Sequence, residues 1–194
     1  MARPKDENKR KEIINSAFEI FGKKGFESTT IKDIAEQANV ASGSVYNYFE
    51  NKEDLFKATV EEGWNDLLSE MEKISNSNEH PLKKFENLME YGFQTLENAI
   101  PLLKGMLFKA NQHEMLHDNL EKFYRNIEKL LLEGKKVGLL NISDDPEQLA
   151  SGIKIIVAGV LFSVAMAKPE EMQDEVKRLK KAIRLMIEER LIKR

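Results

Sequence analysis

Two helix starts lie within sixteen residues of this chain, in the segment ASGSVYNYFENKEDLF that runs from Ala41 to Phe56. Small and hydroxyl residues open a short apolar-periodic stretch at Ser42, and Asn51 opens a second one, with Asp54 three positions later as its capping partner. A helix of about two turns is therefore followed at once by another helix. So short a helix buries little surface of its own, and we expect the helices before it to hold it in place.

Two further helices are predicted before this segment. Apolar residues recur at spacings of three and four over 8–24, and Gly25 is expected to end that helix in the left-handed conformation. Thr30 is expected to cap a second helix, with Asp33 at its third position, and Asn39 to end it, because asparagine tolerates positive φ. The order helix, helix, tight turn and short helix is that of a helix-turn-helix motif.

The short helix, predicted over 42–48, presents an unusual outer surface. A rotation of about 100° per residue turns Val45 and Phe49 toward the core. The outward positions are small, polar or aromatic: Gly43, Ser44, Asn47 and Tyr48, with Tyr46 at the boundary. A short helix with such a face fits endwise into a DNA major groove about 12 Å wide. The next helix would then offer its N-terminal amides and Lys52 to a phosphate.

Composition limits the class of protein but does not reveal the function. The chain has 194 residues, 41% of them hydrophobic, and no cysteine, so no disulfide framework or cysteine metal site is expected. The charged N-terminus has no apolar segment behind it, and no uninterrupted apolar run reaches the roughly 18 residues of a spanning helix, so we expect a cytoplasmic protein. The net charge is −3, and residues 1–52 carry nine basic against eight acidic side chains, a balance too small to indicate DNA binding.

The rest of the chain is predicted to be helical, because no sustained alternation typical of strands occurs. The fold class is therefore all-α. Further helices are expected at about 52–74, 81–98, 101–115, 118–137, 146–167 and 169–192, separated by a polar stretch before Pro81 and by Pro101, Gly138, Pro146 and Pro169. We expect two domains, a three-helix domain over 1–52 and a larger helical domain over 53–194.

Residues 13–56, IINSAFEIFGKKGFESTTIKDIAEQANVASGSVYNYFENKEDLF, closely resemble the N-terminal domain of the TetR family (TetR/AcrR type) of bacterial transcriptional regulators. Asn39 stands where members often have glycine, and Ala41 where many have serine. The resemblance implies a homodimeric repressor that grips an operator of pseudo-twofold symmetry. It also implies that the larger domain binds a small hydrophobic or amphipathic effector, which releases the DNA, and that the last two helices form the dimer interface.

The resemblance carries over to individual positions in the first domain. Ser42, Gly43, Tyr46 and Asn47 look like contacts to base edges or thymine methyl groups. Thr30, Ser44, Tyr48 and Lys52 look like phosphate contacts. Packing is the alternative role for the ring of Tyr46, and helix capping is an additional role for Thr30.

The larger domain has candidate residues for an effector pocket and for a dimer interface. The pocket candidates are aromatic and methionine side chains, each of which has ordinary core packing as its alternative: Trp64, Met89, Tyr91, Phe93, Met106, Phe108, Met115, Phe123 and Tyr124. The interface candidates are Ile156, Gly159, Val160, Ser163, Leu179, Ile183 and Met186. They fall on two helices that would supply a four-helix seam across a twofold axis.

Two other classes of protein compete with a regulator. His113 and His117 stand at metal-ligand spacing on a predicted helix, but no third ligand has a recognisable offset, so we expect no metal site and no cofactor. A helical ligand-binding or metal-dependent protein with no DNA role is the alternative, and the Ser-Gly-Ser and Tyr-Asn-Tyr surface disfavours it. An enzyme is not expected, because the sequence has neither a phosphate-cradling glycine loop nor a nucleophile elbow.

Overall fold

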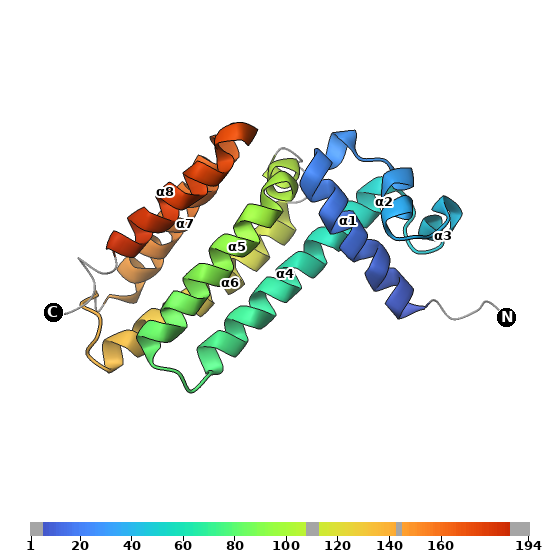
Figure 1. Ribbon diagram of the computed structural model, residues 1–194. Coiled ribbons are helices and arrows are strands. Elements are labelled where there is room, and N and C mark those ends of the chain that lie inside the picture. The colour runs from blue at the N-terminus through green and yellow to red at the C-terminus, as the bar shows by residue number, and fades with distance from the viewer. Residues whose placement is uncertain (1–5, 108–112, 143–144, 187–194) are drawn as a thin grey trace. The chain divides into compact units, whose positions relative to one another are not determined.

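The computed structural model describes residues 6–107, 113–142 and 145–186, and its elements are helices (Figure 1). In chain order they are α1 (Glu7–Ser28), α2 (Ile31–Gln37), α3 (Ser42–Tyr46), α4 (Lys52–Asn76), α5 (Pro81–Leu107), α6 (His113–Lys136), α7 (Pro146–Met166), the 3-10 turn η2 (Pro169–Glu171) and α8 (Met172–Met186). The predicted all-α class is confirmed.

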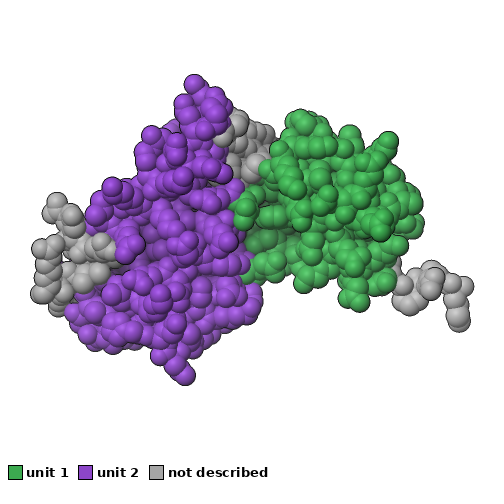
Figure 2. Space-filling model, viewed as in Figure 1, with its two compact units in different colours: residues 1–66, 98–110 green, residues 67–97, 111–194 purple. Residues whose placement is uncertain are grey.

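The chain forms two compact units (Figure 2). Unit 1 comprises residues 1–66 and 98–110, and unit 2 comprises residues 67–97 and 111–194. The compact units thus divide within α4, further along the chain than the predicted functional boundary at residue 52, and unit 1 also takes in the end of α5.

The local signals in unit 1 act as predicted. Gly25 has φ 75° and ψ 167°, so the regular part of α1 ends there even though one further helical turn follows to Ser28. Thr30 and Asp33 form a capping box at the start of α2. Asn39 has φ 52° and ends the turn after α2 in the left-handed conformation. These signals depend on neighbouring residues only, which is why the sequence predicts them.

The core of unit 1 is a cluster of three phenylalanine rings that joins α1 to α4. Phe21 lies 5.0 Å from Phe56 and 5.8 Å from Phe26, and Phe26 lies 4.9 Å from Phe56, all measured between ring centroids. Aliphatic side chains from α1, α2, α3 and α4 complete it: Ile13, Ile14, Ile34, Val45 and Leu55 are all buried. The buried Val45 is the anchor that holds the short α3 to this core.

Unit 2 has two buried clusters, which α4, α5, α6 and α7 supply. Met71, Leu88 and Leu130 form one cluster, with Phe123 packed against it. Leu131, Leu140 and Ile153 form the other, with Tyr124 packed against it. Within this unit α7 packs on both α6 and α8.

The prediction of separate helices over 81–98 and 101–115 is wrong. The single helix α5 runs from Pro81 to Leu107 and includes Pro101, and His113 already belongs to α6. A proline inside a helix removes one backbone hydrogen bond, which the rest of a long helix can tolerate. The short helix is also shorter than predicted, because α3 ends at Tyr46 with Asn47 as its C-terminal cap.

Helix α7 is the most apolar part of the chain, and most of it is exposed. By length and composition alone it is apolar enough to cross a membrane, although residues such as Lys154 interrupt its apolar run. Ile153 and Val164 are buried within unit 2, whereas Ile155, Phe162 and Met166 are 72%, 68% and 67% exposed. These side chains leave an exposed apolar surface on a helix that already packs on α6 and α8.

Candidate nucleic-acid interface

The short helix α3 has one buried side and one exposed side, as the sequence predicts. Val45 is fully buried, and Phe49, just beyond the helix, is only 3% exposed. The Arg10 guanidinium of α1 lies 5.5 Å from the centroid of the Phe49 ring, which further fixes the end of this segment. The buried side of the helix is therefore anchored to the core, and its other side faces solvent.

The predicted base-reading residues lie on the exposed side. Gly43 and Asn47 are exposed, and Ser42 is partly exposed. Tyr46 is 56% exposed, so its ring is not a core side chain. Four of the predicted contacts thus share one surface, which presents hydroxyl, amide and aromatic groups and no fixed charge.

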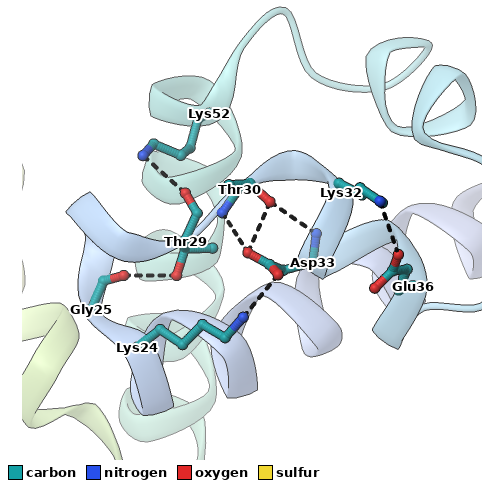
Figure 3. Close-up of polar contacts among 8 residues, drawn as sticks. All are labelled: Lys24, Gly25, Thr29, Thr30, Lys32, Asp33, Glu36 and Lys52. Carbon is teal, nitrogen blue, oxygen red and sulfur yellow. Dashed lines mark hydrogen bonds and ion pairs between the residues drawn. The ribbon is translucent and has the colours of Figure 1, made fainter.

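A network of hydrogen bonds holds the N-terminus of α2 (Figure 3). The Thr30 hydroxyl accepts from the Asp33 backbone N–H at 3.1 Å, and the Asp33 carboxylate accepts from the Thr30 N–H at 2.9 Å. The Lys24 ammonium donates to the same carboxylate at 2.8 Å and ties α1 to α2. This lysine contact, followed by the bonds from Thr30, lowers the pKa of Asp33 from its ordinary 3.8 to about 2. The sequence predicted the cap but not the lysine, which is distant in the chain.

Two predicted phosphate contacts besides Thr30 are Ser44, within α3, and Tyr48, just after it. Ser44 and Tyr48 are both partly exposed, and the Tyr48 ring lies 6.5 Å from that of Phe49. The start of α4 follows directly: the Asn51 side-chain oxygen accepts from the Asp54 N–H at 2.8 Å, as predicted. The Asp54 carboxylate accepts from the N–H of Glu50, which completes the cap.

Lys52 makes contacts within the protein that the sequence does not reveal. Its ammonium donates to the backbone carbonyl groups of Phe26 and Thr29, at 3.0 Å each, and reaches that of Glu27 at 3.5 Å. It also lies 4.4 Å from the centroid of the Phe26 ring. The predicted phosphate contact would have to compete with these partners.

The predicted pocket residues are divided between the two units. Trp64 belongs to unit 1, whereas Met89, Tyr91, Phe93, Phe123 and Tyr124 belong to unit 2. Phe93 is buried, and Phe123 and Tyr124 pack against the two core clusters. Phe108 lies outside the described residues, and the side chains of Met106 and Met115 are likewise not described. A role in ligand binding stays a prediction for all of these residues.

Unit 2 also contains an apolar hollow that the sequence reasoning missed. It is lined by Pro81, Leu82, Phe85, Leu130, Leu131, Gly134, Leu139 and Leu140. Phe85 packs against both core clusters, so this hollow lies at the edge of the same core. Its residues come from the start of α5, the end of α6 and the loop after α6, which no sequence spacing connects.

The predicted interface residues lie on the exposed parts of α7 and α8. Ile156 and Gly159 are exposed, and Val160, Ser163, Leu179, Ile183 and Met186 are partly exposed. The most exposed apolar side chains of α7, Ile155, Phe162 and Met166, were not among the predicted residues. Their spacing of seven and four was a readable signal, because such positions share one side of a helix.

The described residues offer little support for a metal site. His117 is exposed, and nothing is described of the side chain of His113. Among the described residues, no three histidine, aspartate or glutamate side chains gather as metal ligands would.

The described geometry is that of a helix-turn-helix motif: a short, exposed, uncharged helix is anchored on a small helical core. Comparison with known proteins shows which family this segment resembles. Residues 13–59 match the profile of the family described as bacterial regulatory proteins, tetR family. The match covers the helix-turn-helix segment from α1 into α4, and the chain is similar to that family there.

The chain is also similar to individual transcriptional regulators and to solved structures. The HTH-type transcriptional repressor KstR2 of Mycolicibacterium smegmatis is 29% identical over 91 residues, which make up 47% of this chain and 44% of that protein. The aligned segments span between 44% and 59% of the first curated relatives. FadR from Bacillus subtilis, in complex with stearoyl-CoA, shares the fold with a TM-score of 0.67 at 21% identity, over 91% of this chain and 97% of that one. The SmeT–triclosan complex gives a TM-score of 0.66 at 26% identity, over 96% and 92% of the two chains.

Proposed function

We propose that this protein is a cytoplasmic transcriptional regulator, not an enzyme, and that it represses genes by binding an operator through α3. The observation that carries the proposal is the exposed face of α3 around Tyr46 and Asn47, held from beneath by the buried Val45. Such a helix suits a major groove, where amide and hydroxyl groups read base edges. The relatives named as transcriptional repressors support this direction of regulation.

The proposed contacts divide into two classes. Ser42, Gly43, Tyr46 and Asn47 meet base edges and thymine methyl groups, so they determine which sequence is bound. Thr30, Ser44 and Tyr48 meet phosphates and fix the register of the protein on the duplex. Thr30 combines this role with capping α2, because its exposed hydroxyl lies at a helix N-terminus.

The proposed regulator is a homodimer joined through α7 and α8. Ile155, Phe162 and Met166 leave a long apolar stripe uncovered in the single chain, and a second copy would cover it. Two copies of α3 must lie about 34–36 Å apart to enter successive major grooves, so the operator should have pseudo-twofold symmetry.

The proposed effector is a small hydrophobic or amphipathic molecule bound by the C-terminal domain. Support comes from the solved relatives that are described as complexes with stearoyl-CoA and with triclosan. A tenfold loss of DNA affinity requires only about 1.4 kcal/mol of effector preference for the unbound conformation.

The experiment that tests DNA recognition begins with selection of duplexes from a random-sequence pool by the wild-type protein. Asn47→Ala and Tyr46→Ala should each weaken binding to the selected duplex by about 1–3 kcal/mol and change binding to a shuffled duplex little. Asn126→Ala is the matched control, because its side chain donates to the Lys122 carbonyl within α6, in unit 2. Failure to enrich any sequence, or equal losses on both duplexes, would contradict the proposed reading surface.

A further inference from the structure

The ammonium group of Lys52 is fully engaged inside unit 1. It has three hydrogens to donate, and three backbone carbonyl groups lie within reach: those of Phe26 and Thr29 at 3.0 Å and that of Glu27 at 3.5 Å. The face of the Phe26 ring adds a cation–π contact at 4.4 Å. Lys52 is only partly exposed. A phosphate would have to draw this side chain away from all of these partners.

These carbonyl groups lie where α1 ends irregularly. Gly25 leaves the helical conformation at φ 75°, so donors other than the amides of a continuing helix bond to the carbonyl groups at this end. The Thr29 hydroxyl donates to the Gly25 carbonyl at 2.7 Å, and the Thr29 N–H donates to the Phe26 carbonyl at 3.3 Å. Lys52 completes this cap with a positive charge, which the C-terminal end of a helix favours.

The position of Lys52 within its own helix indicates the same role. It is the first residue of α4, and the positive end of a helix dipole disfavours a cation there. Glu53 and Asp54, the other residues of that turn, have the favourable sign. The charge of Lys52 is therefore explained by the end of α1 and not by the helix to which it belongs.

The contact closes a ring that contains the whole DNA-reading segment. The chain leaves the core at Thr29, runs through α2 and α3, and returns at Lys52, which bonds to the Thr29 carbonyl (Figure 3). The entry and exit of the segment are thereby joined. Within the ring, α2 packs on α3, and α3 has only five residues, so the direction in which it points depends on how the ring is held.

We infer that Lys52 is a positioning residue: its ammonium group closes the ring over residues 29–52 and so orients α3, and it does not bind a DNA phosphate. This inference rests on the proposed function for its effect on DNA, while the closure of the ring is a property of the free protein. Loss of the ammonium group should therefore loosen α2 and α3 and reduce sequence recognition without removing a phosphate contact.

The test compares Lys52→Met with Lys57→Met in the full-length protein. Methionine keeps the apolar stem of lysine and removes its charge. Lys57 lies on the same helix, and its side chain is 60% exposed and pairs with Glu61 at 3.9 Å. Its replacement therefore removes one positive charge and leaves the ring closed. Binding to the duplex selected by wild-type protein and to a shuffled duplex is measured at several salt concentrations, at a temperature where circular dichroism shows each variant folded. Amide hydrogen exchange is measured without DNA.

Lys52→Met should bind the selected duplex about tenfold more weakly, the factor that corresponds to one charge-assisted hydrogen bond. Its affinity for the shuffled duplex and the slope of its salt dependence should match those of Lys57→Met. Exchange should be faster over residues 30–49 and unchanged in unit 2. A salt slope about one unit shallower than that of the control, with equal losses on both duplexes, would identify a phosphate contact and overturn the inference.

Two further results separate the remaining explanations. If folded Lys52→Met binds both duplexes as the wild type does, the ring contact affects stability alone and the inference fails. If the wild-type protein enriches no sequence, the proposed function fails, and hydrogen exchange then decides the inference by itself. Faster exchange over 30–49 in Lys52→Met, but not in Lys57→Met, would support the closed ring, and equal exchange would refute it.

Discussion

A buried lysine in unit 2 allows a sharp prediction about stability. Lys84 of α5 is only 5% exposed, and its ammonium donates to both Glu133 carboxylate oxygens, at 2.8 and 3.2 Å, and to the Ser75 carbonyl at 3.0 Å. One side chain thereby links α4, α5 and α6. Because Glu133 has a side chain that is 37% exposed, water can reach the anion but hardly the cation. Removal of Glu133 should therefore lower the free energy of unfolding by a different amount from removal of Lys84.

The magnitudes follow from that difference in exposure. Glu133→Ala leaves a buried ammonium group with one carbonyl partner. Breaking a fully buried ion pair costs about 3–5 kcal/mol, and because Glu133 is partly exposed we expect the free energy of unfolding to fall by about 2–3 kcal/mol. Lys84→Met leaves Glu133 in contact with water and deprives the Ser75 carbonyl of this donor, but it also removes the cost of burying a cation. We therefore expect this variant to lower the free energy of unfolding by about 1 kcal/mol. The double variant should resemble Lys84→Met, which implies a coupling energy of about 2–3 kcal/mol between the two residues.

The assay is urea unfolding followed by far-ultraviolet circular dichroism, together with hydrogen exchange in α5 and α6. Fluorescence is unsuitable, because the single tryptophan, Trp64, belongs to unit 1. Lys83→Met is the control: its side chain is 57% exposed and pairs with Glu86 at 3.4 Å, so the change should stay within about 0.5 kcal/mol. Additive effects of Lys84→Met and Glu133→Ala, or a larger loss for the lysine variant, would refute this reasoning.

Three further predictions concern other parts of the chain. Phe162→Glu should place a charge in the proposed seam and give monomers in sedimentation, with the exposed Lys168→Glu as control; a variant that stays dimeric would place the seam elsewhere. Gly25→Ala should lower the free energy of unfolding by about 1–3 kcal/mol in denaturant titrations, because φ 75° with ψ 167° strains any L-residue, and an unchanged value would contradict that conformation. The depressed pKa of Asp33 means that its stabilising effect is complete above about pH 3.8 and is lost as the pH falls through about 2. The difference in thermal midpoint between wild type and Asp33→Asn should therefore shrink as the pH falls from about 3.8 toward 2, and a difference that stays constant over this range would exclude this cause.

The sequence predicts the elements of unit 1 because their signals are local. The capping box of Thr30 and Asp33, the left-handed Asn39 and the break at Gly25 each depend on a few neighbouring residues. The inward side of the short helix is equally local, because a fixed helical rotation places Val45 on the opposite side from Asn47. The motif, the exposed face of α3 and the all-α class thus follow from the sequence by itself.

Tertiary structure decides what depends on contacts between distant residues. Pro101 resembles a helix start in sequence, yet α5 continues through it, because one lost hydrogen bond is small beside the packing of a long helix. Lys52 resembles a phosphate ligand until the fold brings the end of α1, more than twenty residues earlier, within hydrogen-bond distance. Lys84 resembles any surface lysine until α4 and α6 enclose it. In each case the residue type permits several roles, and only the three-dimensional neighbours determine which groups are close enough to bond.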